Sequence, residues 1–260
     1  MKKIGLALGG GGARGVAHIA YLKAMEEQGL RPSIIAGTSS GAIVGALYAG
    51  GLKPDDIYTL VQNLFSIKKR SGASLIRAFK REGLAANLAK QYFSHVLPKK
   101  NFEELEIPLK IVATNFNTLE EKIFSSGEIL PALMASIAFP SVFVPQPVGD
   151  SFYMDGGATN IVPFDSIRDA CDMLIAIDVS QVRPNKDKPS IKNALHATWA
   201  ATQEALISLK LKHCPVEIFE RPTFEDVSTL EFYKYKSIYK LALSHIPRFI
   251  EQLNKVLIKG

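Results

Sequence analysis

The sequence predicts a three-layer α/β/α sandwich, in which helices cover both faces of a mostly parallel central sheet. Apolar runs of strand length occupy residues 3–8, 33–36 and 173–179. The first two runs each lead through a glycine-containing turn into a segment with helical spacing, as in a parallel strand-helix unit. The chain has 260 residues, 47% of them hydrophobic, which suffices for one large core. We therefore expect a single domain over residues 1–260, with its site at the carboxyl ends of the first strands.

The other elements follow from apolar spacing and turn residues. Further helices are expected at about 16–28, 42–49, 191–212 and 229–257, the last one interrupted or kinked at Pro247. Further strands are expected at about 110–116, 121–124 and 216–219, and a tight hairpin is expected at 148–152. A helix from about Ile129 should end before Pro140, because a proline disfavours helical geometry in the residue before it. Residues 183–189 have the composition of a polar loop.

Residues 53–100 are expected to form a helical, partly basic, cap-like insertion in this domain. Two apolar helical faces have the spacing of core contacts. The first consists of Ile57, Leu60, Val61, Leu64 and Phe65, and the second of Leu84, Leu88, Tyr92 and Val96. The connection between these faces is basic and contains Lys69, Arg70, Arg77, Lys80 and Arg81. This connection is either a solvated surface loop or a cap that docks on anionic lipid beside the site.

The cysteine content and the apolar runs exclude several classes of protein. Only Cys171 and Cys214 are present, with no CxxC pair and no histidine at ligand spacing, so we expect neither a zinc site nor a disulfide framework. The first apolar run is too short for an export signal, and no run is long enough to cross a bilayer. The expected location is therefore cytoplasmic, with peripheral contact at the inner membrane surface left open.

The net charge of +6 suits an anionic partner, either a nucleic acid or an acidic bilayer surface. No zinc-finger, RNA-recognition or basic-zipper signature accompanies the charge. We therefore expect no nucleic acid partner, and a lipid surface is favoured. The sequence makes no prediction about the oligomeric state.

A glycine-rich loop at residues 9–15 joins the first predicted strand to the first predicted helix. Successive glycines allow several backbone N–H groups to point at one anion beside the positive end of a helix. Gly10, Gly12 and Gly15 also match a dinucleotide-binding fingerprint. That fingerprint requires an acidic residue at the end of the second strand, where this chain has Thr38 and Ser39. Nucleotide binding is therefore disfavoured.

The second strand-to-helix turn, residues 37–41, places Ser39 between two glycines. This pattern is typical of a turn that exposes a serine nucleophile at the carboxyl end of a sheet. The alternative is a small-residue turn in which Ser39 or Ser40 only caps the following helix. A neighbouring loop of backbone donors favours the nucleophile, because acyl transfer requires N–H groups aimed at the developing oxyanion.

These motifs resemble the patatin-like phospholipase family, whose bacterial members carry a Gly-Gly-Gly-x-Arg-Gly loop, a Gly-x-Ser-x-Gly turn and an Asp-Gly-Gly motif. All three occur here in the family's order, the last at Asp155, and the resemblance covers most of residues 3–178. It implies a patatin-like fold with Ser39 as nucleophile and Asp155 as its partner. It also implies an oxyanion hole formed by Gly10, Gly11 and Gly12.

A serine nucleophile needs a base, and no histidine has the expected surroundings. His196, His213 and His245 lie in helical or linker stretches without glycines. His18 lies on the first predicted helix. The resemblance implies that Asp155 itself is the base in a Ser-Asp dyad. We then expect partial burial that raises its pKa, or a short hydrogen bond to Ser39. No metal or organic cofactor is expected.

Two further features have more than one interpretation. Arg14 follows the glycines, and its side chain either braces the loop or meets a phosphate head group; bracing is favoured because the residue lies inside the turn. A further bacterial block of the family, Ala-Ser-x-x-x-Pro-x-x-Phe-x-Pro, resembles residues 135–145. This block either shapes the wall of an acyl pocket or serves packing alone.

The resulting functional hypothesis is a lipid acyl hydrolase that cleaves an ester of a phospholipid or lysophospholipid through an acyl-enzyme. A simple carboxylesterase or an acyltransferase would use the same serine. The alternative from a different class is an adaptor protein that uses the fold as a binding module.

Overall fold

The computed structural model describes residues 2–68, 84–140, 142–181, 190–224 and 227–258. Within them, eight strands form one sheet in the order β5-β6-β3-β2-β1-β7-β8, with β4 paired to β3 beside this path. The strands are β1 Ile4–Leu8, β2 Ile34–Thr38, β3 Leu109–Asn115, β4 Glu121–Phe124, β5 Gln146–Val148, β6 Ser151–Asp155, β7 Met173–Ile177 and β8 Ile218–Glu220. The predicted hairpin is present as β5 and β6, which pair antiparallel.

The centre of the sheet is parallel. Strands β3, β2, β1, β7 and β8 all run in the same direction, whereas β4 and β6 pair antiparallel with β3. Every residue of β1 is buried, as expected of a central strand covered on both faces. Leu8 at its end lies between Gly37 of β2 and Ile177 of β7, so the carboxyl ends of three strands meet at one edge.

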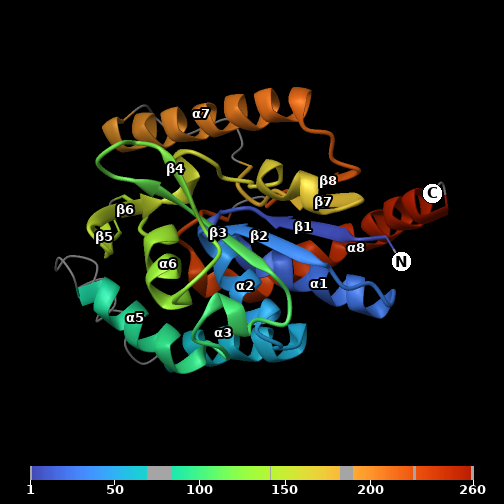
Figure 1. Ribbon diagram of the computed structural model, residues 1–260, viewed down its shortest axis with the longest axis horizontal. Coiled ribbons are helices and arrows are strands. Elements are labelled where there is room, and N and C mark those ends of the chain that lie inside the picture. Colours follow the sequence, from blue (N-terminus) through green and yellow to red (C-terminus); the bar gives the residue numbers. More distant parts are fainter. Residues whose placement is uncertain (1, 69–83, 141, 182–189, 225–226, 259–260) are drawn as a thin grey trace.

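Helices cover both faces, which confirms the predicted three layers (Figure 1). Helix α7 Ile191–His213 lies over one face, and α1 Ala17–Glu27, α2 Ser40–Ala49 and α8 Tyr235–Ile258 lie over the other. The side chains of β1 alternate accordingly: Leu6 and Leu8 join the larger apolar core, and Ala7 joins the smaller core under α7. Short 3-10 segments occur at Gly12–Val16, Phe102–Glu104, Gly156–Ala158, Asp165–Ala170 and Phe232–Lys234.

The region at 53–100 contains α3 Pro54–Lys68 and α5 Leu84–Val96, and α6 Ile129–Ser136 follows later in the chain. Ile57 is fully buried, and the Tyr92 hydroxyl donates to the Leu60 carbonyl, which ties α5 to α3. Leu88 is an exception among the predicted core contacts, since it is 46% exposed. The basic connection, with Lys69, Arg70, Arg77, Lys80 and Arg81, lies outside the described residues, as does the loop predicted at 183–189.

The first and last helices differ from prediction in where they begin. A 3-10 turn at Gly12–Val16 precedes α1, and α8 begins at Tyr235 rather than near residue 229. Helix α8 also continues through Pro247, so the helix is not interrupted there, and of the two predicted alternatives the kink stays a prediction. Phe249 and Leu253 beyond the proline are fully buried, and this tertiary packing offsets the hydrogen bond that proline cannot make.

Candidate active site

Ser39 lies in the turn between β2 and α2, with φ 52° and ψ −120°. This backbone conformation is rare for a residue with a side chain, and it stores strain. The glycines on either side allow the turn to close. A Cβ at Gly41 would lie 2.0 Å from the carbonyl oxygen of Leu8, and one at Gly37 would lie 2.7 Å from the nitrogen of Ala42. The strained turn therefore depends on the absence of side chains at both positions.

Asp155 ends β6 and faces Ser39 across the carboxyl edge of the sheet. Its Oδ2 accepts a hydrogen bond from the Ser39 hydroxyl at 2.7 Å, although the two residues are 116 positions apart in the chain. Its Oδ1 accepts from the N–H of Gly157, also at 2.7 Å. The carboxylate is thus oriented from both oxygens, and one of them points at the hydroxyl.

The Asp155 side chain is deeply buried, with 2% of the residue exposed. Burial raises the pKa of this carboxyl from 3.8 to about 6, while the hydrogen bonds from Ser39 and Gly157 oppose the rise. The expected burial and the expected short hydrogen bond are therefore both present. A carboxylate with this pKa is a better proton acceptor at neutral pH than an ordinary aspartate.

The three candidate oxyanion glycines differ in their backbone hydrogen bonds. The Gly10 N–H donates to the Ile161 carbonyl at 2.9 Å, so it is not free to bind an oxyanion in this structure. The N–H groups of Gly11 and Gly12 have no hydrogen-bond partner among the residues that the structure describes. Gly10 serves instead as a close neighbour of the serine, because a Cβ there would lie 3.2 Å from the Cβ of Ser39.

His18 is fully buried beneath the glycine loop, with its Nε2 2.8 Å from the Gly9 carbonyl oxygen. A carbonyl oxygen only accepts, so Nε2 carries the proton. Burial lowers the pKa of His18 to about 4, and the ring is neutral at physiological pH. His18 therefore supports the loop, and the hydrogen-bond partner of the Ser39 hydroxyl is Asp155 rather than a histidine.

The Arg14 side chain is directed into the protein, where it is 6% exposed. Its Nε and Nη2 donate to the Val227 carbonyl at 3.0 and 2.7 Å, and its Nη1 donates to the Gln181 carbonyl at 2.7 Å. Burial lowers the pKa of the Arg14 guanidinium from its ordinary value, and the nearby Asp178 carboxylate opposes this effect. These contacts, all to backbone carbonyls, are those of a loop brace.

An apolar wall formed by Phe139, Ile161 and Trp199 lies beside Ser39 and Asp155. Phe139 belongs to the block at 135–145, whereas no sequence pattern singled out Ile161 or Trp199. The Ile161 side chain fits between the glycine loop and Gly157, since a Cβ at Gly10 or at Gly157 would lie 2.7 Å from its Cδ1. Trp199 of α7 lies beside Gly157 and packs edge to face on Phe139, with ring centroids 5.5 Å apart. These residues come from three separate segments, so only the fold brings them together.

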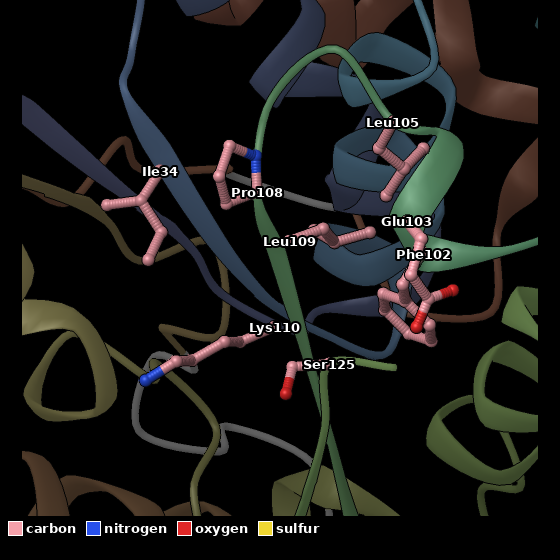
Figure 2. A pocket seen from close by; sticks show the side chains of 8 residues that line it. All are labelled: Ile34, Phe102, Glu103, Leu105, Pro108, Leu109, Lys110 and Ser125. Atoms are coloured by element: carbon pink, nitrogen blue, oxygen red, sulfur yellow. The ribbon is translucent and has the colours of Figure 1, made fainter. Parts of the chain in front are cut away.

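A cavity of about 280 Å³ lies elsewhere, lined in part by Ile34, Phe102, Leu109 and Lys110 (Figure 2). It lies at the amino ends of β2 and β3. Ser39 lies five positions after Ile34, which corresponds to roughly 16 Å along an extended strand. The Lys110 ammonium donates to the Ser166 carbonyl, so this charge is already engaged within the protein. The cavity is therefore separate from the Ser39 site.

No group of three or more His, Cys, Asp or Glu side chains in the described part of the chain could hold a metal ion.

The sequence profile of the patatin-like phospholipases matches residues 6–168, which is more than half of the chain. The chain belongs to the patatin-like phospholipase family. This match includes the glycine loop, the Ser39 turn and Asp155.

Curated relatives of this patatin-like chain include three proteins at 28% identity. Lysophospholipase NTE1 of Kluyveromyces lactis aligns over 97% of this chain and 19% of its own length. Lysophospholipase NTE1 of Saccharomyces cerevisiae aligns over 96% of this chain and 16% of its own length. The patatin-like phospholipase domain-containing protein ZK370.4 of Caenorhabditis elegans aligns over 93% of this chain and 20% of its own length. The chain thus spans about a fifth of the length of these relatives.

Solved structures with a related arrangement include VipD from Legionella pneumophila, with a TM-score of 0.49 and 13% identity over 94% of this chain and 67% of that chain. ExoU from Pseudomonas aeruginosa gives a TM-score of 0.49 and 17% identity over 98% of this chain and 52% of that chain. These similarities are too low to carry an argument about the site.

Proposed function

We propose that this protein hydrolyses acyl esters of lipids with Ser39 as nucleophile and Asp155 as base. The observation that carries the proposal is the 2.7 Å hydrogen bond from the Ser39 hydroxyl to a buried carboxylate. Ser39 attacks the ester carbonyl as Asp155 takes its proton, and the alcohol leaves with that proton. Asp155 then takes a proton from the water that attacks the acyl-enzyme, and it returns this proton to the Ser39 oxygen as the fatty acid leaves.

The oxyanion hole is proposed to consist of the N–H groups of Gly11 and Gly12. Their lack of a partner in the described residues makes them available as donors, in contrast to Gly10. They follow β1, whose end lies beside the end of β2 and hence beside Ser39. Loss of one such donor typically costs about 3 kcal/mol of transition-state stabilisation. Arg14 and His18 are proposed to hold this loop in place.

The proposed substrate is a lysophospholipid or phospholipid. Two of the relatives named above are lysophospholipases, and the apolar wall of Phe139, Ile161 and Trp199 provides a surface for a fatty acyl chain. A wall of this kind recognises the chain by burial of apolar surface rather than by hydrogen bonds, so it favours long acyl groups over short ones.

The test compares the wild type with Ser39→Ala and Asp155→Asn on a short-chain chromogenic ester and a fluorogenic lysophospholipid. Both variants should lose at least about 1,000-fold in kcat/KM, because the nucleophile or its base is removed. A fluorophosphonate probe should label the wild type at Ser39 and fail to label Ser39→Ala. Undiminished activity of Ser39→Ala would refute the proposal, and a folded wild type that neither hydrolyses nor labels would support an adaptor instead.

Peripheral contact with an anionic membrane is proposed through the beginning of α7. Ile191 and Leu195 are 84% and 68% exposed, and they lie two turns and one turn, respectively, before Trp199 on the same helical face. This stripe leads from solvent to the apolar wall. The double variant Ile191→Ser, Leu195→Ser should bind anionic vesicles several-fold less tightly, measured by co-sedimentation, with labelling by a water-soluble fluorophosphonate unchanged. Equal vesicle binding would refute this docking surface.

Further proposals concern the chain as a whole. No helix in the described ranges is long and apolar enough to cross a membrane. We propose a cytoplasmic location, which suits the free Cys171 and Cys214. We also propose one domain with a cap-like insertion at about 53–100. Affiliation with the bacterial branch of the family is proposed on the motifs alone, since the relatives named here are fungal and nematode proteins.

A further inference from the structure

The block at residues 135–145 has no role in the chemistry described above, yet its first residues contact both members of the pair. Ser136 ends α6 and is fully buried. Its Oγ accepts a hydrogen bond from the backbone N–H of Ser39 at 2.8 Å. Two residues later, the Ala138 carbonyl accepts from the backbone N–H of Asp155 at 3.0 Å. A single short segment thus contacts the backbones of the nucleophile and the base.

These two contacts set the distance between Ser39 and Asp155 independently of their side chains. Ser39 comes from the end of β2 and Asp155 from the end of β6, and β3 lies between these two strands in the sheet. No ladder hydrogen bond therefore connects them directly. The segment 136–138 bridges this separation, because the Ser136 hydroxyl oxygen binds the backbone of Ser39 and the Ala138 carbonyl oxygen binds the backbone of Asp155.

The contact from Ser136 also serves the strained conformation of Ser39. The N–H of Ser39 lies between Thr38, which ends β2 and its register with β3, and Ser40, which begins α2. It therefore has no partner from regular secondary structure. Ser136 Oγ supplies that partner from a third element, which favours the conformation that aims the Ser39 hydroxyl at Asp155.

We propose that Ser136 is a positioning residue that holds the Ser39 turn against Asp155. This inference rests on the proposed hydrolase function, but the hydrogen bond itself can be tested without it. Ser136 does not touch the proposed reacting atoms, since the contact is to the backbone N–H. The proposal therefore predicts a loss in the chemical step rather than in substrate binding.

The kinetic test uses Ser136→Ala, which removes the acceptor, and Ser136→Thr, which keeps it. Ser136→Ala should lower kcat and the rate of fluorophosphonate labelling by about 30- to 100-fold, the scale of a misplaced reacting group, with KM changed less than about 3-fold. Ser136→Thr should recover most of the labelling rate. The matched control is Ser33→Ala, which removes a hydroxyl bonded to the Ile4 carbonyl at the amino end of β2 and should label at the wild-type rate.

Hydrogen exchange of the Ser39 amide supplies a readout that does not depend on activity. In Ser136→Ala this amide should exchange about 5- to 10-fold faster than in the wild type, as expected for one lost hydrogen bond. Amides in the middle of α2 should be unaffected. If exchange is accelerated but the wild type is inactive, the contact is established and the hydrolase proposal fails.

Two results would overturn the positioning role. One is an unchanged exchange rate at Ser39 in a folded Ser136→Ala protein. The other is a Ser136→Ala labelling rate equal to that of Ser33→Ala, at matched melting temperature, in an active enzyme. If Ser136→Thr does not fold, the comparison of Ser136→Ala with Ser33→Ala still decides the question.

Discussion

At the scale of single residues, burial of the Asp155 carboxyl lowers the stability of the folded protein and makes the carboxylate a stronger base. The carboxyl is buried, and its pKa is raised to about 6, so the folded protein holds its proton to higher pH than the unfolded chain does. Between about pH 4 and 6 the folded state binds more protons, and the contribution of this residue to stability falls as the pH rises. Above that range the destabilisation is complete and constant.

Asp155→Asn should therefore be more stable than the wild type at pH 7. Asparagine can still accept from Gly157 and can donate to Ser39, while the buried charge is removed. A pKa raised from 3.8 to about 6 corresponds to at most about 3 kcal/mol. Melting curves should show the variant melting higher at pH 7, with the difference shrinking toward pH 4. A lower melting temperature at pH 7 would contradict the burial cost assigned to Asp155.

The pH dependence of the proposed activity follows from the same group. Asp155 must be ionised to accept the proton of Ser39, and its pKa in the free protein is about 6. The value of kcat/KM should fall about tenfold for each pH unit below 6 and should be level between about pH 7 and 8. His18, with a pKa lowered to about 4, would not produce this limb. A profile that remained level down to pH 4.5 would exclude Asp155 as the base.

At the scale of elements, the glycine loop is held by groups that arrive from distant segments. Gly9 is bound by His18 of α1, and Gly10 is bound by the carbonyl of Ile161. Arg14 joins the turn to the carbonyls of Gln181 and Val227. The loop is thereby fixed before any substrate arrives, which is the condition for effective oxyanion stabilisation.

Arg14→Lys should weaken this arrangement although the charge is kept. A lysine ammonium cannot reproduce the planar fork that reaches two carbonyls, so buried acceptors lose their donors. The melting temperature should fall by about 4 to 10 °C, and labelling of Ser39 should slow. The matched control is Arg31→Lys, whose ion pair with Glu106 is about half exposed and should matter little. Equal melting temperatures for both variants would argue against the brace.

At the scale of the whole molecule, the sheet separates two edges with different properties. The carboxyl edge carries Ser39, the apolar wall and the Gly11 and Gly12 N–H groups, which have no hydrogen-bond partner in the described part of the chain, whereas the 280 Å³ cavity lies at the amino edge. The proposed chemistry depends only on the first of these. A group introduced into the cavity should therefore leave the chemistry unchanged.

Ser125→Trp tests this separation, because Ser125 lines the cavity. Hydrolysis of the lysophospholipid and labelling of Ser39 should both stay within about 2-fold of the wild type, since the change is remote from the reacting groups. Loss of hydrolysis in a folded Ser125→Trp protein would contradict this prediction and would mean that the cavity is part of the substrate path.

Much of the fold and the candidate residues could be read from local patterns. The strands at the centre of the sheet have apolar runs because both of their faces are buried, and helices follow them at regular spacing. The glycines beside Ser39 and within residues 9–12 are equally local signals, since each marks a backbone position where a side chain would clash. These features depend on neighbours in the chain, so the sequence expresses them directly.

Other properties arise only when distant segments meet. The position of the Ile161 carbonyl decides that the Gly10 N–H is engaged, while the Gly11 N–H has no partner among the residues with a described structure. The pKa of Asp155 depends on how completely the fold excludes water from its carboxyl group. The hydroxyl of Ser136 finds the Ser39 amide across 97 positions of the chain. Local residue spacing carries no record of such contacts, because hydrogen bonds and desolvation act through space rather than along the chain.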